Sequence, residues 1–262
     1  MQSLFDELSA TYDLSRVNFF GQIARTLIEY ARVRQGATVL DVGCGAGAAL
    51  IPASEAVGAT GHVVGIDFAL GMVERARRTV SDQALENVQV LVGDAECPPT
   101  EQRSVDVIVS SLVLFFLPNI DDAFEAYART LVAGGTLAFS TFAGDDDWTP
   151  LDKIVATFAR PPSQALPDTW FKTPSAIQAT LEAHRFHNVS IHDITHQVQF
   201  PDISTFHEWN WSTGWRAAWS AIPPEHRETA LAAVNNHLRN LQAQRGSLRL
   251  DTAVRYTRAE AT

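Results

Sequence analysis

The stretch from Val39 to Gly47 constrains the fold more than any other part of the chain. It reads VLDVGCGAG, a short apolar run followed by glycine at every second position. The apolar run is typical of a buried parallel strand, and residues 46–57 are typical of the helix that follows such a strand. Because glycine lacks a Cβ atom, this turn lets a ligand approach the N-terminus of the helix closely. The stretch therefore predicts an α/β fold that holds a nucleotide-type cofactor.

The glycine spacing distinguishes two classes of cofactor. Dinucleotide folds favour G-x-G-x-x-G, whereas here the third glycine comes one position early and Asp41 precedes the turn. The pattern D-x-G-x-G-x-G resembles motif I of class I methyltransferases that depend on S-adenosylmethionine (SAM). Asp67 ends a second apolar segment, where an acid can grip a ribose diol. A Gly-Asp-Ala step containing Asp94 follows a third segment, in the order of the same family.

The chain is similar to the small-molecule methyltransferases of ubiquinone and menaquinone biosynthesis. The resemblance implies SAM as the cofactor and S-adenosylhomocysteine (SAH) as the product. It also implies that Tyr12, in an N-terminal Tyr-Asp signature, closes over the methionine end of SAM; anchoring of the N-terminal segment to the core is the alternative role. The cofactor-binding residues expected on this basis are Tyr12, Asp41, Gly43, Gly45, Gly47, Asp67, Phe68, Met72, Asp94, Ala95 and Ser110.

The same resemblance implies a seven-stranded Rossmann-like sheet of order 3-2-1-4-5-7-6, with helices on both faces. The last four strands are expected at residues 105–111, 136–141, 189–200 and 248–257, with a turn at 132–135 before the fifth. Three regions are expected: a helical lid at 1–36, a SAM-binding domain at 37–200 and 247–262, and a helical cap inserted at 201–246.

Two departures from the family pattern limit what can be carried over. The family often has serine two residues after the ribose-binding acid, where it caps the next helix, but this chain has Ala69. Relatives often carry two histidines after the fourth strand, whereas this chain has Phe115 and Phe116. No catalytic histidine can therefore be inherited from that motif.

The cap region is expected to contain two helices, at 203–222 and 224–244. In the first, Trp211, Trp215 and Trp219 recur at helical spacing with His207 on the same face, while Trp209 points elsewhere. Such a stripe forms either part of the core or an aromatic wall for the methyl acceptor. The expected substrate-binding residues are Phe19, Phe115, Trp170, His207, Trp211 and Trp215, and the candidates for catalysis are His207, Glu208 and Tyr12.

Composition limits the partners of the chain. A formal net charge of −10 disfavours nucleic acid, and no apolar run approaches the ~20 residues of a membrane span. We expect a cytoplasmic monomer or homodimer that acts on a small molecule and uses no metal. Residues 145–147 are three consecutive aspartates, which we interpret as a solvated loop and not as a metal site.

These features predict SN2 transfer of the SAM methyl group to an oxygen, nitrogen or carbon of a small hydrophobic or aromatic metabolite, in specialised-metabolite biosynthesis. Two alternatives remain at this point. The chain can bind SAM without transferring its methyl group, as a cyclase or a regulator. An NAD-dependent oxidoreductase is the more remote alternative, because the early third glycine and the Gly-Asp-Ala step disfavour it.

Overall fold

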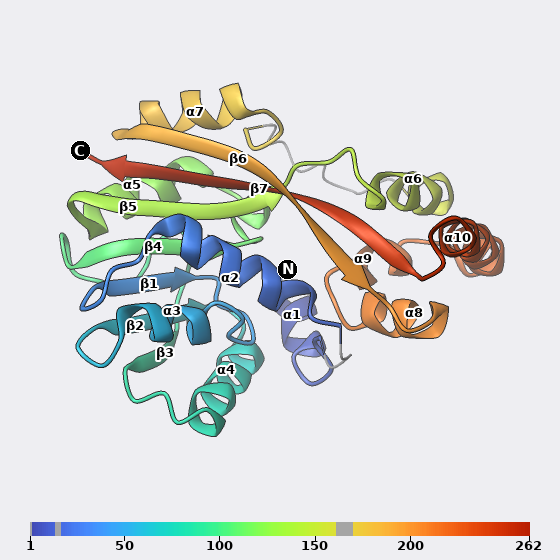
Figure 1. Ribbon diagram of the computed structural model, residues 1–262, viewed down its shortest axis with the longest axis horizontal. Coiled ribbons are helices and arrows are strands. Elements are labelled where there is room, and N and C mark those ends of the chain that lie inside the picture. The colour runs from blue at the N-terminus through green and yellow to red at the C-terminus, as the bar shows by residue number, and fades with distance from the viewer. Residues whose placement is uncertain (1, 14–16, 161–169) are drawn as a thin grey trace.

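The computed structural model describes residues 2–13, 17–160 and 170–262, and in this part of the chain seven strands form one sheet (Figure 1). Their order is β3-β2-β1-β4-β5-β7-β6, as predicted. Strand β7 is antiparallel to both of its neighbours, and the other pairs are parallel. The strands are β1 Thr38–Val42, β2 His62–Asp67, β3 Val88–Val92, β4 Val105–Ser111, β5 Leu131–Phe142, β6 Phe186–Gln199 and β7 Arg249–Ala261.

Helices cover both faces of the sheet, because its central strands are apolar on both sides. Val39 and Leu40 are adjacent in β1 and both fully buried, but they belong to different hydrophobic clusters. The Val39 cluster packs under α2 Phe19–Ala31, α3 Leu50–Val57 and α4 Leu70–Asp82. The Leu40 cluster packs under α5 Ile120–Thr130 and α7 Pro174–Ala183, and Thr173 caps α7 as its sequence predicts.

Strands β6 and β7 run beyond the rest of the sheet and reach a separate group of helices (Figure 1). This group consists of α6 Trp148–Phe158, α8 Ile203–Trp211, α9 Arg216–Ser220 and α10 Pro224–Arg245. The single helix expected at 203–222 is wrong, because the chain leaves α8 at Ser212, whose hydroxyl donates to the carbonyl of Trp209 at 2.8 Å. Trp211 is therefore 43% exposed while Trp219 is buried, so the three tryptophans do not form one stripe.

The N-terminal helix α1 Gln2–Leu8 packs against the start of α4. Ala69, at the N-cap of α4, makes no side-chain capping bond, as the sequence implies. The amide of Gly71 in the first turn instead donates to Oδ1 of Asp6 at 3.1 Å. A Cβ atom on Gly71 would lie 2.3 Å from Oγ of Ser9, so this close approach requires glycine.

Two local predictions need correction. Residues 132–135 are part of strand β5 and not a turn before it, and they lie where the register with β4 shifts between Val105 and Val107. The aspartates of 145–147 are not a purely solvated loop: Asp147 accepts hydrogen bonds from Arg245 and from the amide of Asp251, which ties the start of α6 to α10 and β7.

None of the helices in the described residues is both long enough and apolar enough to cross a membrane.

Candidate active site

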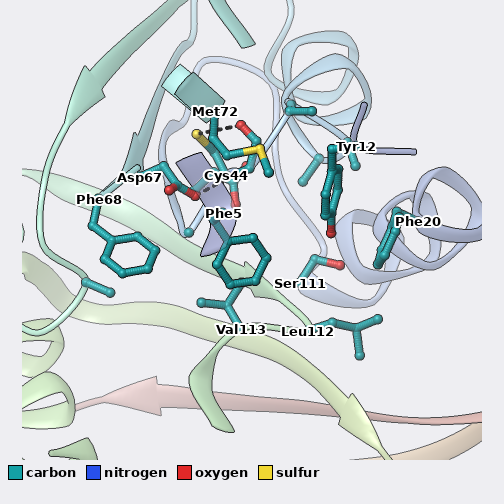
Figure 2. Close-up of a pocket in the computed structure, with 18 of the residues that line it drawn as sticks. Phe5, Tyr12, Phe20, Cys44, Asp67, Phe68, Met72, Ser111, Leu112 and Val113 are labelled. Carbon is teal, nitrogen blue, oxygen red and sulfur yellow. Dashed lines mark hydrogen bonds between the residues drawn. The ribbon is translucent and has the colours of Figure 1, made fainter. Parts of the chain in front are cut away.

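A cavity of about 760 Å³ opens where β1, β2, β3 and β4 end (Figure 2). Its wall includes residues at the end of each of these strands or just after it, among them Gly43, Asp67, Asp94 and Ser111. The cavity thus lies at the carboxyl edge of the sheet, beside the point where the strand order reverses between β1 and β4, which is where open α/β sheets bind ligands. Its volume is within the range of about 300–1,000 Å³ found for small-molecule sites.

The glycine turn is shaped by backbone strain and by a close neighbour. Gly43 has a φ of +71°, and a Cβ atom there would lie 2.5 Å from Cγ1 of Val113. Gly45 has a φ of +52° and open space around it, so its backbone faces the cavity directly. Left-handed φ values are costly for residues with a side chain. The turn therefore needs glycine at Gly43 for space and at Gly45 for conformation.

Asp67 at the end of β2 is buried and held by backbone amides. Its Oδ2 accepts from the amide of Gly45 and its Oδ1 from the amide of Ala69, each at 2.9 Å. Burial raises the pKa of this carboxyl, and the two amides act in the opposite direction. Each carboxylate oxygen keeps a further lone pair, so Asp67 can also accept hydrogen bonds from the two hydroxyls of a ribose.

Asp41 is 1% exposed at the end of β1, and no described residue donates a hydrogen bond to either of its carboxylate oxygens. Burial, and next the charge of Asp67, raise its pKa to about 7. A buried carboxylate without partners is costly, and a donor on a bound ligand would lower that cost. Because Asp41 lines the cavity, this arrangement fits an amine of the ligand.

Aromatic side chains close the cavity from the N-terminal segment. Phe5 lies 6.3 Å from Phe68 and 6.0 Å from Phe116, measured between ring centroids. Tyr12 stacks on Phe20 at 5.4 Å. Figure 2 shows Tyr12 and Phe20 at one side of the cavity and Phe68 at the other. The cavity therefore has aromatic side chains at two opposite sides, and its lining also includes the acids Asp41 and Asp67.

Cys44 is a structural residue of the glycine turn. It is 5% exposed, its thiol lies 3.9 Å from the carbonyl of Gly45, and burial raises its pKa well above the usual value. A Cβ atom on Gly65 in β2 would lie 3.1 Å from its sulfur, which shows how tightly the turn packs on the sheet. The thiol therefore stays protonated, and its size explains its position.

Comparison with known proteins assigns a family to this geometry. A model of a methyltransferase domain matches residues 39–135. The nocamycin O-methyltransferase of Saccharothrix syringae is 31% identical over 246 residues, which cover 87% of this chain and 87% of that protein. The chain belongs to the SAM-dependent methyltransferase family.

A second relative agrees with this assignment, and a solved structure shares the fold. The aklanonic acid methyltransferase DauC of Streptomyces sp. (strain C5) is 43% identical over 137 residues, which span 52% of this chain but only 62% of DauC. The YcgJ protein of Bacillus subtilis has the same fold, with a TM-score of 0.63 at 18% identity over 92% of this chain and 98% of that one. This methyltransferase uses SAM as its cofactor. The unpartnered Asp41, the amide-held Asp67 and the open face of Gly45 fit SAM.

The cavity brings together nearly all the residues that the sequence suggested for SAM. Ser110 is the exception: it is fully buried, and its hydroxyl donates to the carbonyl of Val42 at 2.9 Å. The next residue, Ser111, lines the cavity in its place. The other predicted residues line the cavity, namely Tyr12, Asp41, Gly43, Gly45, Gly47, Asp67, Phe68, Met72, Asp94 and Ala95.

The structure places the expected substrate-binding residues outside the cavity lining. Phe19 is buried against Trp148, and its neighbour Phe20 faces the cavity. Phe115 packs on other rings, and Phe116 faces the cavity. In both pairs the sequence analysis identified the right segment, but the residue that lines the cavity is the next one along the chain. Trp170 packs in the core beside Phe124 and Phe139, Trp215 packs beside Trp148, and Trp211 is exposed at the surface.

His207 and Glu208 also lie away from the cavity. Nε2 of His207 is 2.7 Å from Oδ1 of Asn235, so this histidine joins α8 to α10. Glu208 is exposed at the surface of α8. Neither residue is in the cavity lining, so the geometry gives no support to a proton transfer by either one.

Sequence reasoning assigned no role to Asp13 and none to Trp209. Asp13 lines the cavity, and its Oδ1 accepts a hydrogen bond from Nε1 of Trp209 at 3.0 Å. Trp209 is fully buried and joins α8 to the N-terminal segment. The sequence signal that could have identified Asp13 was the Tyr-Asp signature. An acid next to a tyrosine that lines a cavity is a candidate to hold or move a proton.

Proposed function

We propose that this enzyme transfers the methyl group of SAM to an oxygen atom of a small, largely apolar metabolite. The observation that carries this proposal is the aromatic and aliphatic surface at the Tyr12 end of the SAM cavity, formed with Phe20 and Leu112. Apolar walls with few polar groups are typical of sites for hydrophobic ligands. The nocamycin relative, which aligns with 87% of this chain, is named an O-methyltransferase, and this name supports oxygen as the acceptor atom.

The charges of the cavity support an acceptor without a negative charge. Among the described lining residues, Arg75 is the single cation, whereas Asp13, Asp41, Asp67, Asp94 and Glu96 are acids. Such a field favours a cationic cofactor such as SAM and disfavours a second anion beside it.

SAM supplies an already activated methyl group, so the protein needs mainly to align the reactants and exclude water. Asp67 would hold the ribose, Asp41 the amine, Phe68 and Ala95 the adenine, and Tyr12 and Phe5 would cover the site. Burial raises the pKa of the Tyr12 phenol, which therefore stays protonated and can act as a hydrogen-bond donor but not as a base.

We further propose that residues 1–36 act as a lid and residues 201–246 as a cap over the acceptor, with the remaining residues forming the SAM-binding domain. The contacts between the two segments support this division. Trp209 of the cap donates to Asp13 of the lid, and Arg216 lies 4.0 Å from Glu7. We expect a monomer or a homodimer, which light scattering distinguishes.

Calorimetric titration with SAM, followed by an SAH-release assay, tests this function. We expect micromolar SAM binding that Asp67→Ala abolishes and that Asp145→Asn, at an exposed aspartate outside the cavity, leaves unchanged. The acceptor panel pairs aromatic hydroxyl compounds with the matching amines and carboxylic acids, for example naphthol, naphthylamine and naphthoic acid. SAH release with hydroxyl compounds supports the proposal. Tight SAM binding with SAH release from the amines alone would contradict transfer to oxygen.

A further inference from the structure

Asp13 combines three features that no other acid of the cavity shares. It lies in the lid and it lines the cavity. Its Oδ1 also accepts a hydrogen bond from Trp209, a residue that is not part of the cavity lining. No described residue donates to its second oxygen, Oδ2. Its φ of +49° is in the left-handed region, which aspartate and asparagine tolerate better than most residues. The carboxylate is thus fixed at one oxygen and open at the other.

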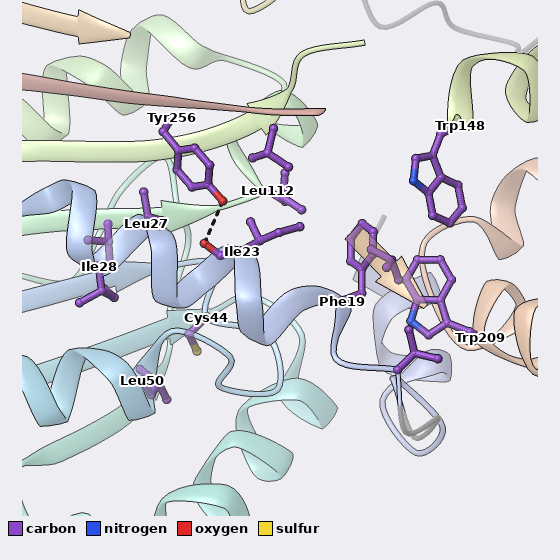
Figure 3. Packing of buried hydrophobic residues seen from close by; sticks show 14 of the residues in the cluster. Phe19, Ile23, Leu27, Ile28, Cys44, Leu50, Leu112, Trp148, Trp209 and Tyr256 are labelled. Carbon is purple, nitrogen blue, oxygen red and sulfur yellow. Dashed lines mark hydrogen bonds between the residues drawn. The ribbon is translucent and has the colours of Figure 1, made fainter. Parts of the chain in front are cut away.

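Trp209 is a rigid partner for this carboxylate. Its indole is fully buried, with ring centroids 4.8 Å from Phe19, 5.6 Å from Trp148 and 5.9 Å from Phe200 (Figure 3). A ring packed on several sides has little freedom to rotate, so its N–H points in one fixed direction. The orientation of Asp13 is therefore set by the hydrophobic cluster between the lid and the cap.

The contacts of Trp209 place Asp13 at the acceptor end of the cavity. Trp209 lies 6.0 Å from Phe20, which stacks on Tyr12, the residue adjacent to Asp13. Phe68 lies at the opposite side (Figure 2), and Asp94 and Ala95 line the cavity after β3, the strand that pairs with β2 before Phe68. A group bound beside Tyr12 and Phe20 is therefore close to Asp13 and remote from the expected adenine site.

The surroundings of Asp13 suit a proton acceptor at neutral pH. Burial raises its pKa to about 7, while the hydrogen bond from Trp209 and the charge of Arg75 oppose this rise. Arg75 belongs to α4 and also donates to the carbonyl of Ser9 at 3.1 Å. The Tyr12 phenol keeps its proton because burial raises its pKa. A general base works best when its pKa is near the working pH.

We propose that Asp13 accepts the proton of a neutral hydroxyl on the methyl acceptor, so that the substrate class is a phenol, an enol or an alcohol and not a carboxylate. This inference rests on the proposed function. The hydroxyl O–H bond breaks with its proton passing to Oδ2 of Asp13. The hydroxyl oxygen bonds to the methyl carbon, and the bond from that carbon to sulfur breaks with its electron pair left on sulfur. The protonated Asp13 then returns its proton to solvent.

A carboxylate acceptor makes the opposite prediction for pH. It carries no proton to remove, and ionised Asp13 would repel it. Turnover of a carboxylate would therefore fall as the pH rises through the pKa of Asp13, whereas turnover of a hydroxyl acceptor would rise. The sign of the pH dependence separates these two substrate classes.

The decisive variant is Asp13→Asn, measured with the hydroxyl acceptor that gives the fastest SAH release. Asparagine tolerates the same φ and its Oδ1 can still accept from Trp209, so the fold and the hydrogen bond are kept. We expect kcat to fall by about 100-fold or more, the usual scale of general base catalysis. The rise of kcat with pH near 7 should disappear, while the affinity for SAH measured by calorimetry stays within about two-fold of the wild type.

Asp145→Asn is the matched control, because Asp145 also has a left-handed φ of +60° but is exposed and outside the cavity. It should leave kcat and the pH profile unchanged. If Asp13→Asn also retained the wild-type kcat and profile, the role of Asp13 would be refuted while the proposed function stood. A wild-type enzyme that released no SAH with any hydroxyl acceptor would refute both.

Trp209 provides a readout that needs no substrate. Because its indole N–H donates to Asp13, its NMR signal should titrate with a midpoint near pH 7, and Asp13→Asn should abolish that titration. Trp209→Phe keeps an aromatic ring but removes the donor that lowers the pKa of Asp13. The rise of kcat should then shift to higher pH without loss of SAH affinity. An unshifted pH profile would contradict the positioning role of Trp209.

Discussion

The amide of Gly71 donates to Oδ1 of Asp6 at 3.1 Å, so a side chain of α1 caps α4, the helix that follows β2. The cap that Ala69 cannot supply comes from a different segment of the chain. The contact between α1 and α4 thus lies next to Asp67 and Phe68, which precede this helix and line the cavity.

Asp6→Ala should lower the free energy of unfolding by about 1 kcal/mol, the usual cost of losing an N-cap. Ala69 has the extended backbone of an N-cap residue, so Ala69→Ser should supply a local cap and reduce the cost of Asp6→Ala in the double variant. Urea denaturation of the wild type, the two single variants and the double variant measures these free energies, with Glu7→Ala as the control for loss of a neighbouring exposed carboxylate. If Asp6→Ala lowered the free energy of unfolding equally whether residue 69 is Ala or Ser, Asp6 would not act as a cap.

Gly43→Ala should destabilise the protein more than Gly134→Ala. Both glycines have a φ of +71°, so each substitution carries a backbone cost of about 1–2 kcal/mol. Only at Gly43 does the new Cβ also meet Val113, and overpacking adds about 1–3 kcal/mol. Val113→Ala should remove that additional cost in the double variant. Denaturation curves test this difference, and equal losses for the two glycines would leave no role for Val113.

Asp41 should make the ligand-free protein less stable as the pH rises from about 4 to 7. Burial raises its folded-state pKa to about 7, above the usual 3.8, so the folded state binds more protons than the unfolded state in this window. Stability then declines with increasing pH, because it rises only where the unfolded state binds more protons. Asp41→Asn should flatten this decline in thermal unfolding curves. Asp13 titrates in the same window, so the test is done with Asn at position 13 in both proteins.

The same carboxyl should link SAM binding to proton release. A ligand amine favours the ionised form of Asp41, so binding at pH 6 should release a proton that is not released at pH 9. Calorimetry in two buffers of different ionisation enthalpy measures the number of protons. Proton release that persists in Asp41→Asn at pH 6 would assign it to another group.

Asp147→Asn should cost about 1–3 kcal/mol of stability, because it weakens the acceptor of the Arg245 guanidinium and of the Asp251 amide. The adjacent Asp145 is exposed, so Asp145→Asn should stay within about 0.5 kcal/mol of the wild type. Thermal unfolding of both variants measures the two losses of stability. Similar effects at the two positions would show that the three aspartates are a solvated loop after all.

The local sequence was sufficient to predict which strand ends meet at the cavity. Asp41, the glycine turn, Asp67 and Asp94 each lie at the end of a strand, and parallel strands bring their carboxyl ends to one edge of the sheet. The errors at these strand ends are shifts of one residue, as with Ser110 in place of Ser111. Which of two neighbours faces the cavity depends on how the element packs on the sheet, and periodicity alone does not contain that information.

The contacts on the proposed acceptor side were decided by the tertiary structure. Helical spacing suggested one stripe of three tryptophans with His207, but the break at Ser212 leaves Trp211 exposed at the surface while His207 still contacts Trp219. Trp209 instead meets Asp13, a residue 196 positions earlier in the chain. A hydrogen bond between segments so far apart exists only after the sheet has placed the lid beside the cap. The sequence by itself determined the fold and the cofactor, because these follow from short βα units, while the lid and cap contacts arise from long-range packing.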